Sequence, residues 1–466
     1  MTSASLVQNL GLRDSAAKIK AMTRNVYLLT NMNEKNVYDA IVVGARIAGA
    51  GMAGLLSQAG FRVLLVDRVQ FPKPTLSCPL YFGNAFAILD RMGALPRIEA
   101  IGAPKAHLYQ VEVKDIHLHG HLLPYHGHDY SYSIRREIFD ELLFEHVAGM
   151  PNVETRLGFN ITGLLWDDSH HRVLGVKGSI GGGTPEEIRA EMVVGADGLF
   201  SVVAQQTSPE RYNIKPPHTC AYYAYYSNVK PAAREPSATM YFNTENKSYC
   251  ITADSDSDLT VISITLPASR FEEARRNPER VHEFYPRQIP LLAERIRNAR
   301  RETPVYGVSP RESVYRVPFG PGWVLVGDAG YYKDPITGQG IHDALRSAEL
   351  AAAAYTQYRA GANWNAAMCR YQLVRDRETR GMYGLTDYYA QIDRKIMAQE
   401  FSLFRAIAAQ PRWANRYVSM FNGVTDVSWF IKPTTALRIY WEWQARKLLR
   451  RVTAGSHNLT PFEARE

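Results

Sequence analysis

The stretch from residue 39 to residue 67 constrains the fold more than any other part of this sequence. It contains an apolar, β-branched run (39–43), the turn GARIAGAG (44–51), a helix of small residues ending at Gly60, and a second apolar run ending at Asp67. Continuous apolar runs of this length are typical of buried parallel strands, and parallel neighbours require a crossover between them. The order of strand, glycine turn, helix, strand and acid predicts a βαβ unit that binds a dinucleotide.

One residue of the turn departs from the usual fingerprint G-x-G-x-x-G. Gly44 supplies the tight turn and Gly49 the close packing of helix and strand, but Arg46 replaces the glycine beside which the pyrophosphate lies. An arginine adds positive charge at a helix N-terminus that already favours anions, so we expect a phosphate site. The alternative is an ordinary βαβ unit with a blocked loop. Asp67, 23 positions after Gly44, stands where an acid binds the adenosine ribose.

Two later segments also join an apolar run to a glycine turn. Residues 192–201 read MVVGADGLFS, and residues 324–346 read VLVGDAGYYKDPITGQGIHDALR. Together with the first turn, they resemble the FAD-dependent monooxygenases of the para-hydroxybenzoate hydroxylase type, a family also related to geranylgeranyl reductases. The resemblance is greatest to a subgroup whose first loop reads GARxAGA. Flanking similarities are VDRVQFP (66–72), SIRREIFDELL (133–143) and YYAYY (222–226).

The resemblance implies FAD as the cofactor. It places the first turn at the pyrophosphate, Arg68 at the adenine, Arg136 at the phosphates, Asp328 at the ribityl hydroxyls, and residues 335–340 beside the isoalloxazine. The implied cofactor-binding residues are Gly44, Arg46, Gly49, Asp67, Arg68, Arg136, Asp197, Gly327, Asp328, Pro335, Gly338, Gln339 and Gly340. The candidate catalytic residues are Tyr222, Tyr331 and Pro335, with packing as the alternative role of the tyrosines.

Three positions depart from the family pattern. The second motif lacks the basic residue usual a few positions on, where Ala204 stands, and His342 replaces a common asparagine. The segment 331–334 (YYKD) is also unusual. Because it flanks the expected flavin site, we expect it to influence substrate choice.

The whole pattern predicts an α/β fold in which a Rossmann-like FAD-binding domain is interleaved with an α+β substrate domain built on an antiparallel sheet. Strand-like runs fall at 105–125 and within 218–266. Tyrosines 222, 223, 225 and 226 span both faces of one such run, so one face predicts an aromatic-lined pocket. The expected division is an N-terminal extension (1–37), FAD-binding parts (38–104, 126–205, 316–385), substrate parts (105–125, 206–315) and a C-terminal helical region (386–466).

Composition and the terminal segments limit the expected partners and cellular location of the protein. The net charge of +8 suits anionic cofactors, but the basic residues are spread along the chain, so no nucleic-acid partner is expected. No uninterrupted apolar run is long enough to span a membrane. The four cysteines lie far apart, which favours a reducing, cytoplasmic location. Three interpretations of residues 1–37 remain open: a transit peptide, a loosely attached helix, or an upstream extension of a protein that starts at Met32.

Two further patterns leave alternatives open. His117, His119 and His121 recur with period two, which places them on one face of a strand. This face is expected to be solvated or to form a proton relay. A metal site is the third alternative, but no metal is expected. Residues 429–451 mix aromatic residues and arginines. We expect them to cap the substrate cavity, with a dimer face or a membrane surface as alternatives, and the chain to be a monomer or homodimer.

The family resemblance implies an FAD-dependent monooxygenase. In that family, NAD(P)H binds transiently and reduces FAD. The reduced flavin then reacts with O2 to form a C4a-hydroperoxide, which hydroxylates or epoxidises a hydrophobic, aromatic small molecule. Only one full βαβ fingerprint is present, so no separate NAD(P)H domain is expected. The alternatives are a geranylgeranyl-reductase-like C=C reductase, a flavin-dependent halogenase and a non-enzymatic flavoprotein. The halogenase signature W-x-W-x-I-P is not met by WEW at 441–443.

Overall fold

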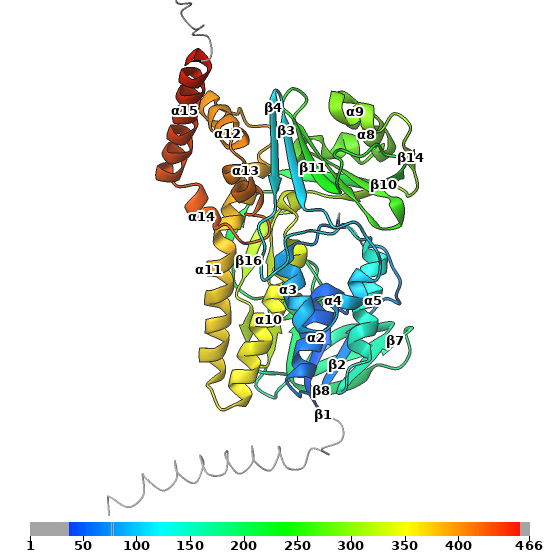
Figure 1. Cartoon of the computed structure of the whole chain (residues 1–466). Coiled ribbons are helices and arrows are strands. Elements are labelled where there is room, and N and C mark those ends of the chain that lie inside the picture. Colours follow the sequence, from blue (N-terminus) through cyan, green and yellow to red (C-terminus); the bar gives the residue numbers. More distant parts are fainter. Residues whose placement is uncertain (1–36, 76, 78, 457–466) are drawn as a thin grey trace, which may run out of the picture.

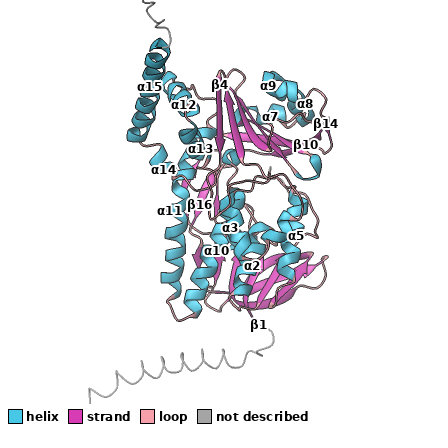
Figure 2. Cartoon of the chain, viewed as in Figure 1, coloured by secondary structure: helices cyan, strands magenta, loops and turns pink. Residues whose placement is uncertain are grey.

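The computed structural model describes residues 37–75, 77 and 79–456. The expected extension at 1–37 therefore lies outside the described residues, apart from residue 37, where the first strand begins. The described chain forms two bodies stacked end to end, with a column of helices along one side (Figure 1). One body is a sheet flanked by helices, and the other is dominated by strands (Figure 2). The predicted α/β class is confirmed.

The first body is built on a mainly parallel sheet of order β17-β18-β8-β1-β2-β5. The pairs β1–β2, β1–β8, β2–β5 and β8–β18 are parallel, while β6 and β7 extend β8 as an antiparallel ribbon. The predicted βαβ unit is therefore present as β1, α2 and β2. The bounds are β1 Val37–Val43, α2 Ile47–Gln58, β2 Val63–Asp67, β5 Val153–Leu157, β6 Phe159–Trp166, β7 Val173–Ile180, β8 Glu186–Gly195, β17 Phe319–Gly320 and β18 Trp323–Leu325.

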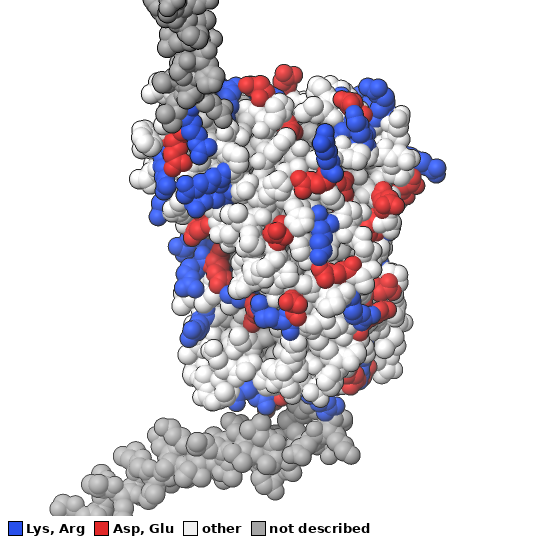
Figure 3. Space-filling model, in the orientation of Figure 1, with Lys and Arg blue, Asp and Glu red and all other residues white. Residues whose placement is uncertain are grey.

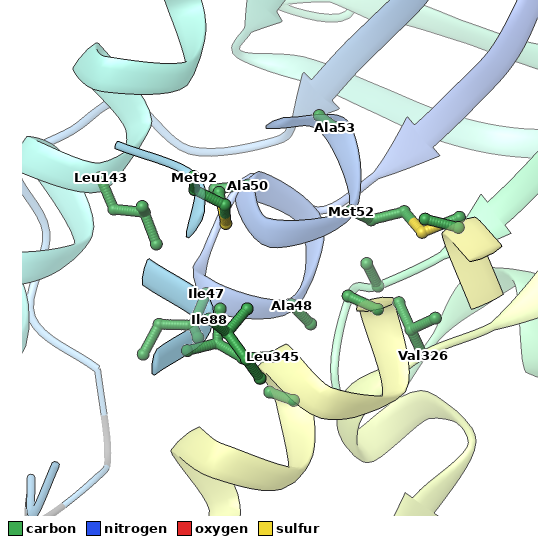
Figure 4. Close-up of a cluster of buried hydrophobic side chains, with 14 of the residues drawn as sticks. Ile47, Ala48, Ala50, Met52, Ala53, Ile88, Met92, Leu143, Val326 and Leu345 are labelled. Atoms are coloured by element: carbon green, nitrogen blue, oxygen red, sulfur yellow. The ribbon is translucent and has the colours of Figure 1, made fainter. Parts of the chain in front are cut away.

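Helices and a ribbon cover the two faces of this sheet. Small residues in α2 let α10 approach closely, since a Cβ added to Gly51 would lie 3.0 Å from the Leu345 Cδ2 atom. Figure 4 shows Leu345 beside Ile47 and Ile88 in this core. The opposite face is covered by the β6–β7 ribbon and α6. The helices are α3 Gly83–Arg91, α4 Leu95–Glu99, α5 Arg136–Ala148, α6 Val202–Thr207 and α10 Gly340–Arg359.

The second body is built on a sheet of order β14-β10-β13-β12-β11-β3-β4, with β15 also beside β10. All its pairs are antiparallel except β11–β3, which is parallel. The predicted runs at 105–125 and 218–266 supply most of these strands. The bounds are β3 Leu108–Val113, β4 Ile116–His121, β10 Thr219–Ser227, β11 Ser237–Asn243, β12 Ser248–Asp254, β13 Thr260–Pro267, β14 Arg300–Arg301 and β15 Tyr306–Val308.

The second sheet is covered on both faces. Helices α7 to α9 pack on one face, and the C-terminal helices pack over part of the other. Helix α11 runs through residue 385, so the expected boundary between 385 and 386 falls inside one continuous helix. The bounds are α7 Phe271–Ala274, α8 Pro278–Phe284, α9 Pro290–Arg295, α11 Trp364–Ala390, α12 Ala398–Ala408, α13 Pro411–Val418, α14 Val427–Phe430 and α15 Pro433–Ser456.

The histidine-rich strand β4 alternates between buried and exposed residues, and His117, His119 and His121 share its exposed face, as their spacing predicts. Nowhere in the described part of the chain do three or more His, Cys, Asp or Glu side chains gather as metal ligands would. Among the same residues, no helix combines the length and the apolarity that a membrane span requires.

Candidate active site

A pocket of about 870 Å³ lies between the two bodies. It opens at the carboxyl ends of the parallel strands, where ligands of open α/β sheets bind, and reaches the second sheet. Most of the predicted cofactor residues line it, together with two of the three candidate catalytic residues. The predicted residues in its lining are Gly44, Arg46, Asp67, Arg68, Arg136, Asp197, Asp328, Tyr331, Pro335, Gly338 and Gly340.

The first turn needs two glycines for different reasons. Gly44 has a φ of +101°, and an added Cβ would lie 2.6 Å from the carbonyl oxygen of Ala196. At Gly49 an added Cβ would lie 1.6 Å from the carbonyl oxygen of Gly44. Gly49 is absent from the pocket lining. It shapes the turn from behind, and we infer no direct contact with a cofactor.

Asp67 ends β2 and holds the first turn. Its carboxylate accepts hydrogen bonds from the backbone nitrogens of Ala45, at 2.8 Å, and Val69, at 3.0 Å. These two bonds fix the carboxylate at the edge of the pocket, where each oxygen retains acceptor capacity for a ribose hydroxyl. Arg68 follows it in the lining.

Arg46 and Arg136 meet at a carboxylate that the sequence analysis missed. Arg46 donates to the Oδ2 atom of Asp140 at 2.7 Å, and Arg136 donates through Nε to the Oδ1 atom at 2.9 Å. The Asp140 side chain is fully buried. Although desolvation opposes it, the Asp140 charge raises the pKa of Arg136. The spacing of four residues between Arg136 and Asp140 on α5 is the sequence signal that would have found this pair.

The Arg46 guanidinium also binds residues 71–75, a segment that contributes Lys73 and Thr75 to the pocket lining. It donates to the carbonyl oxygen of Lys73 at 3.3 Å and lies 5.8 Å from the centre of the Phe71 ring. The arginine in the unusual turn thus connects α2, α5 and the 71–75 segment. Since this role occupies much of its hydrogen-bonding capacity, Arg46 positions the pocket wall, and any phosphate contact must use its remaining donors.

We expect Arg46→Gly to lower the free energy of unfolding by about 1–3 kcal/mol, because a buried carboxylate loses one of two cationic partners. FAD affinity should fall less than about tenfold, since the charge of Arg136 remains. Thermal unfolding and FAD titration of the purified protein measure both effects. Arg46→Lys is the control that keeps the charge. A loss of FAD affinity far above tenfold in the glycine variant alone would instead show direct phosphate binding by Arg46.

The second motif places Asp197 at the start of a short capped helix. Its Oδ2 atom accepts a hydrogen bond from the backbone nitrogen of Val202 at 2.7 Å, and burial raises its pKa. Its Oδ1 atom is buried without a hydrogen-bond partner among the described residues, so the carboxylate has acceptor capacity left at the pocket. Ala204 is buried on α6, and Arg316 from a neighbouring strand donates to the carbonyl oxygen of Leu199 at 3.5 Å.

Asp328 follows β18 in the turn η4 (Gly327–Ala329) and faces the pocket. Burial raises the pKa of its carboxyl to about 6, with a further increase from Asp343 and an opposing decrease from Lys333. Gly327 supports the turn from behind: its φ is +58°, and an added Cβ would lie 2.8 Å from the Ala48 Cβ atom on α2. Gly327 does not line the pocket.

The turn before α10 presents Pro335, Gly338 and Gly340 to the pocket. Gly338 has a φ of +65°, which favours glycine. Gln339, by contrast, is buried and donates to the carbonyl oxygens of Thr337, at 3.2 Å, and Phe421, at 2.9 Å. It ties the turn to the C-terminal region and is absent from the lining, so its expected place in the wall is corrected to a supporting one.

A buried ion pair beside this turn also escaped the sequence analysis. Lys333 bonds Asp343, and their side chains are only 4% and 12% exposed. The Lys333 ammonium lies 5.0 Å from the centre of the Tyr331 ring. Asp343 sits in the first turn of α10, and although burial opposes it, Lys333 lowers its pKa. His342 approaches the same carboxylate at 3.5 Å. The unusual segment 331–334 thus places one cation in the pocket wall.

The far end of the pocket is largely apolar and lies under the second sheet. Tyr223, not Tyr222, faces it. Tyr222 points to the opposite face of β10, into the core formed with α7 to α9, so its candidate catalytic role is corrected. The Tyr223 hydroxyl donates to the carbonyl oxygen of Thr75 at 2.8 Å. The other residues at this end are Leu80, Ala221, Tyr249, Ile251, Ser263, Thr265 and Val308.

We expect Tyr222→Phe to leave FAD binding unchanged and stability equal or higher, because the lost hydroxyl is buried with no partner among the described residues. Tyr223→Phe, the matched change one residue on, should lower the free energy of unfolding by about 1 kcal/mol. It should also let iodide quench bound FAD more readily, since the 71–75 segment loses an anchor. Equal quenching in the two variants would contradict the orientation of β10 described here.

The donors and acceptors of this pocket suit FAD. Two arginines and a helix N-terminus match phosphates, two carboxylates match the hydroxyls of the two sugar moieties, and a glycine turn leaves room for a flat ring. No residue beyond Ala344 lines the pocket among the described residues, so the expected cap by residues 429–451 is not part of its wall. The C-terminal region packs next to it, through Phe421, in the turn after α13, against Phe82.

This site and the sheet around it define a nucleotide-binding flavoprotein. The family described as "FAD binding domain" matches residues 37–364, and the chain belongs to that family. The protein is therefore an FAD-dependent oxidoreductase, as the resemblance implied. The finer subgroup defined by a GARxAGA loop stays a prediction.

Relatives with known names fall into several reaction classes. The chain is 27% identical over 328 residues to a tryptophan 2-halogenase of Chondromyces crocatus, covering 69% of this chain and 61% of that protein. It is 26% identical over 349 residues to a digeranylgeranylglycerophospholipid reductase of Methanosarcina acetivorans, covering 70% and 77%.

Solved structures share the fold. The flavin-dependent brominase Bmp2 superposes with a TM-score of 0.73 at 21% identity, covering 88% of this chain and 99% of that one. PqsL, a probable FAD-dependent monooxygenase of Pseudomonas aeruginosa, superposes with a TM-score of 0.62 at 20% identity, covering 83% and 100%.

Proposed function

We propose that this protein is an FAD-dependent monooxygenase that uses NAD(P)H and O2 to hydroxylate or epoxidise a hydrophobic, aromatic small molecule. The observation that carries the proposal is one continuous pocket that joins the predicted flavin turn to an end lined by tyrosines and aliphatic side chains. Such an end suits an apolar substrate. When bound, FAD supplies the redox chemistry that connects NAD(P)H with O2.

The residues of the chain have separate tasks in this proposal. Asp67 and Asp328 orient the cofactor at its two sugar moieties, and Arg136 neutralises its phosphates. The turn from Pro335 to Gly340 and the N-terminus of α10 favour negative charge at the ring. Tyr223 and Arg46 hold the 71–75 segment across the opening and limit entry of water. Tyr331 and Pro335 line the wall where substrate and ring would meet.

A flavin-dependent halogenase is the second candidate, because the brominase superposes more closely than the monooxygenase does. Both reactions require O2, so the shared site does not separate them. A C=C reductase, the third class among the relatives, would need no oxygen. The absence of the W-x-W-x-I-P pattern from the sequence still favours oxygen insertion.

The test is rapid mixing of the anaerobically reduced, FAD-loaded full chain with oxygenated buffer, followed by absorbance. We expect a transient species that matches neither oxidised nor reduced FAD. Parallel turnovers with a panel of aromatic compounds under 18O2, with and without bromide, identify the transferred atom. Products that contain 18O and that form in the absence of halide support the proposal. Halide-dependent brominated products would replace it with the halogenase, and reduction of a C=C bond without O2 would replace it with the reductase.

We further propose the domain division given above, except that its last boundary lies beyond the end of α11 at Ala390, and a cytoplasmic location. The described cysteines Cys220, Cys250 and Cys369 are free thiols, which suits a reducing compartment. NAD(P)H as a transient donor, and the choice between monomer and homodimer, belong to the same set of proposals.

A further inference from the structure

Helix α15 packs against the body through one side only. Thr435 and Ile439 are buried, and Glu442 accepts a hydrogen bond from the Trp413 Nε1 atom at 2.8 Å. The Gln410 side chain donates to the carbonyl oxygen of Ile439 at 3.1 Å. Figure 1 shows α15 at the outer side of the molecule, next to α12 and above α14. The helix is therefore firmly attached, and its other side is free in the described structure.

The free side carries large apolar residues at helical spacing. Leu437, Trp441 and Leu448 are 69%, 71% and 65% exposed, and Tyr440 is 43% exposed. Positions four and seven apart lie on one side of a helix. Ile431, just before the helix, is 60% exposed. Clusters of this kind on a folded protein mark a surface that contacts another protein or a membrane.

The charges around this stripe have one sign. Arg438, Arg446 and Lys447 are exposed on α15, and Lys432 precedes it. The single acid of the helix, Glu442, is turned inward and is bonded by Arg438 at 2.9 Å. In Figure 3, Lys and Arg side chains recur along this edge of the molecule, with some Asp and Glu side chains between them. The stripe is thus flanked by positive charge with no exposed acid on the helix between residues 433 and 448.

We propose that α15 is a docking surface for an anionic lipid bilayer. Trp and Tyr rings prefer the boundary between headgroups and acyl chains, and basic residues beside them attract anionic lipids. A second copy would bring like charges together, so the helix does not favour self-association. It also fails the criteria of a membrane span. We infer that α15 lies in the interface with its stripe inserted. This inference does not depend on the proposed reaction.

The test uses the FAD-loaded full chain and sedimentation with vesicles of phosphatidylcholine alone or mixed with phosphatidylglycerol. We expect binding to the anionic vesicles that weakens as salt screens the charges. The double variant Trp441→Ser/Leu448→Ser should bind roughly tenfold or more weakly, because two apolar side chains that would insert into the bilayer are lost. The matched control is Leu291→Ser, which changes a 48% exposed leucine on α9. It should bind as the wild type does.

Four outcomes would overturn the proposal. One is a wild-type chain that stays in the supernatant with anionic vesicles at low salt. Another is a double variant that keeps full FAD content and wild-type thermal unfolding and yet sediments as before. The third is light scattering that shows a concentration-dependent dimer, abolished by the double variant, which would assign the stripe to a second copy. Binding of an acidic protein or nucleic acid in place of vesicles would likewise reject the lipid surface.

Discussion

Asp328→Asn is expected to lose most of its FAD affinity and yet to unfold at a higher temperature in the cofactor-free state. Burial raises the pKa of Asp328 to about 6, so at pH 7.5 the folded, empty protein holds a desolvated carboxylate. The shift of about two units corresponds to at most about 3 kcal/mol of lost stability. Asparagine removes that cost. It also removes the anionic acceptor expected for the ribityl hydroxyls, which weakens FAD binding by roughly 10- to 100-fold.

The stability difference should depend on pH in a defined direction. Because the folded pKa of this carboxyl is raised above its unfolded value, the cost is absent below about pH 4, grows as pH increases, and is complete above about pH 6. Melting temperatures of the empty wild type and variant should therefore converge near pH 4 and separate near pH 7.5. Asp393→Asn, at an exposed aspartate that does not line the pocket, is the control for a simple change of charge. Full FAD content in Asp328→Asn would contradict the ribityl assignment.

Gly49→Ala is expected to prevent the first turn from forming. The added methyl would lie 1.6 Å from the carbonyl oxygen of Gly44, and neither backbone segment can move without breaking β1 or α2. We expect a loss of more than about 3 kcal/mol in the free energy of unfolding, at the upper end of overpacking effects. Expression of soluble protein, FAD content and chemical denaturation measure this result.

Gly340→Ala is the matched change at the start of α10. An added Cβ there meets no atom within 4 Å, so the fold should keep its stability to within about 1 kcal/mol. Gly340 nevertheless lines the pocket, so FAD affinity should fall if the ring lies against this turn. Equal stability of the two alanine variants would show that the packing of α2 on Gly44 is looser than described.

Local patterns predicted the elements of this fold and much of the site. The βαβ unit and the strands of the second sheet each depend on residues close in sequence, and the three glycine turns mark where strands end. The prediction that Tyr222 on β10 faces the pocket was wrong for a different reason. Seven of its nine residues are buried, because α7 to α9 cover one side and the pocket wall with the 71–75 segment lies on the other, so no alternation reveals which tyrosine faces the pocket.

The missed residues depend on contacts between distant segments. Asp140 matters because Arg46, 94 positions away, reaches it. Lys333 and Asp343 pair across the turn that leads into α10. Gln339 has an amide group that suits a cofactor, but Phe421 of the C-terminal region accepts its hydrogen bond. The spacing of four residues could have indicated the Arg136–Asp140 pair, but the contacts of Arg46, Lys333 and Gln339 require the tertiary arrangement.

The two bodies share one polypeptide in alternating segments: β1 to α4 belong to the first, β3 and β4 to the second, α5 to β8 to the first again, and β10 to β15 to the second. No single cut of the chain therefore releases either body as an independent unit, and a fragment ending near residue 205 would leave β3 and β4 without the partner strand β11. Attempts to shorten this enzyme, or to exchange its substrate-facing half with that of a relative, must replace several separate stretches at once.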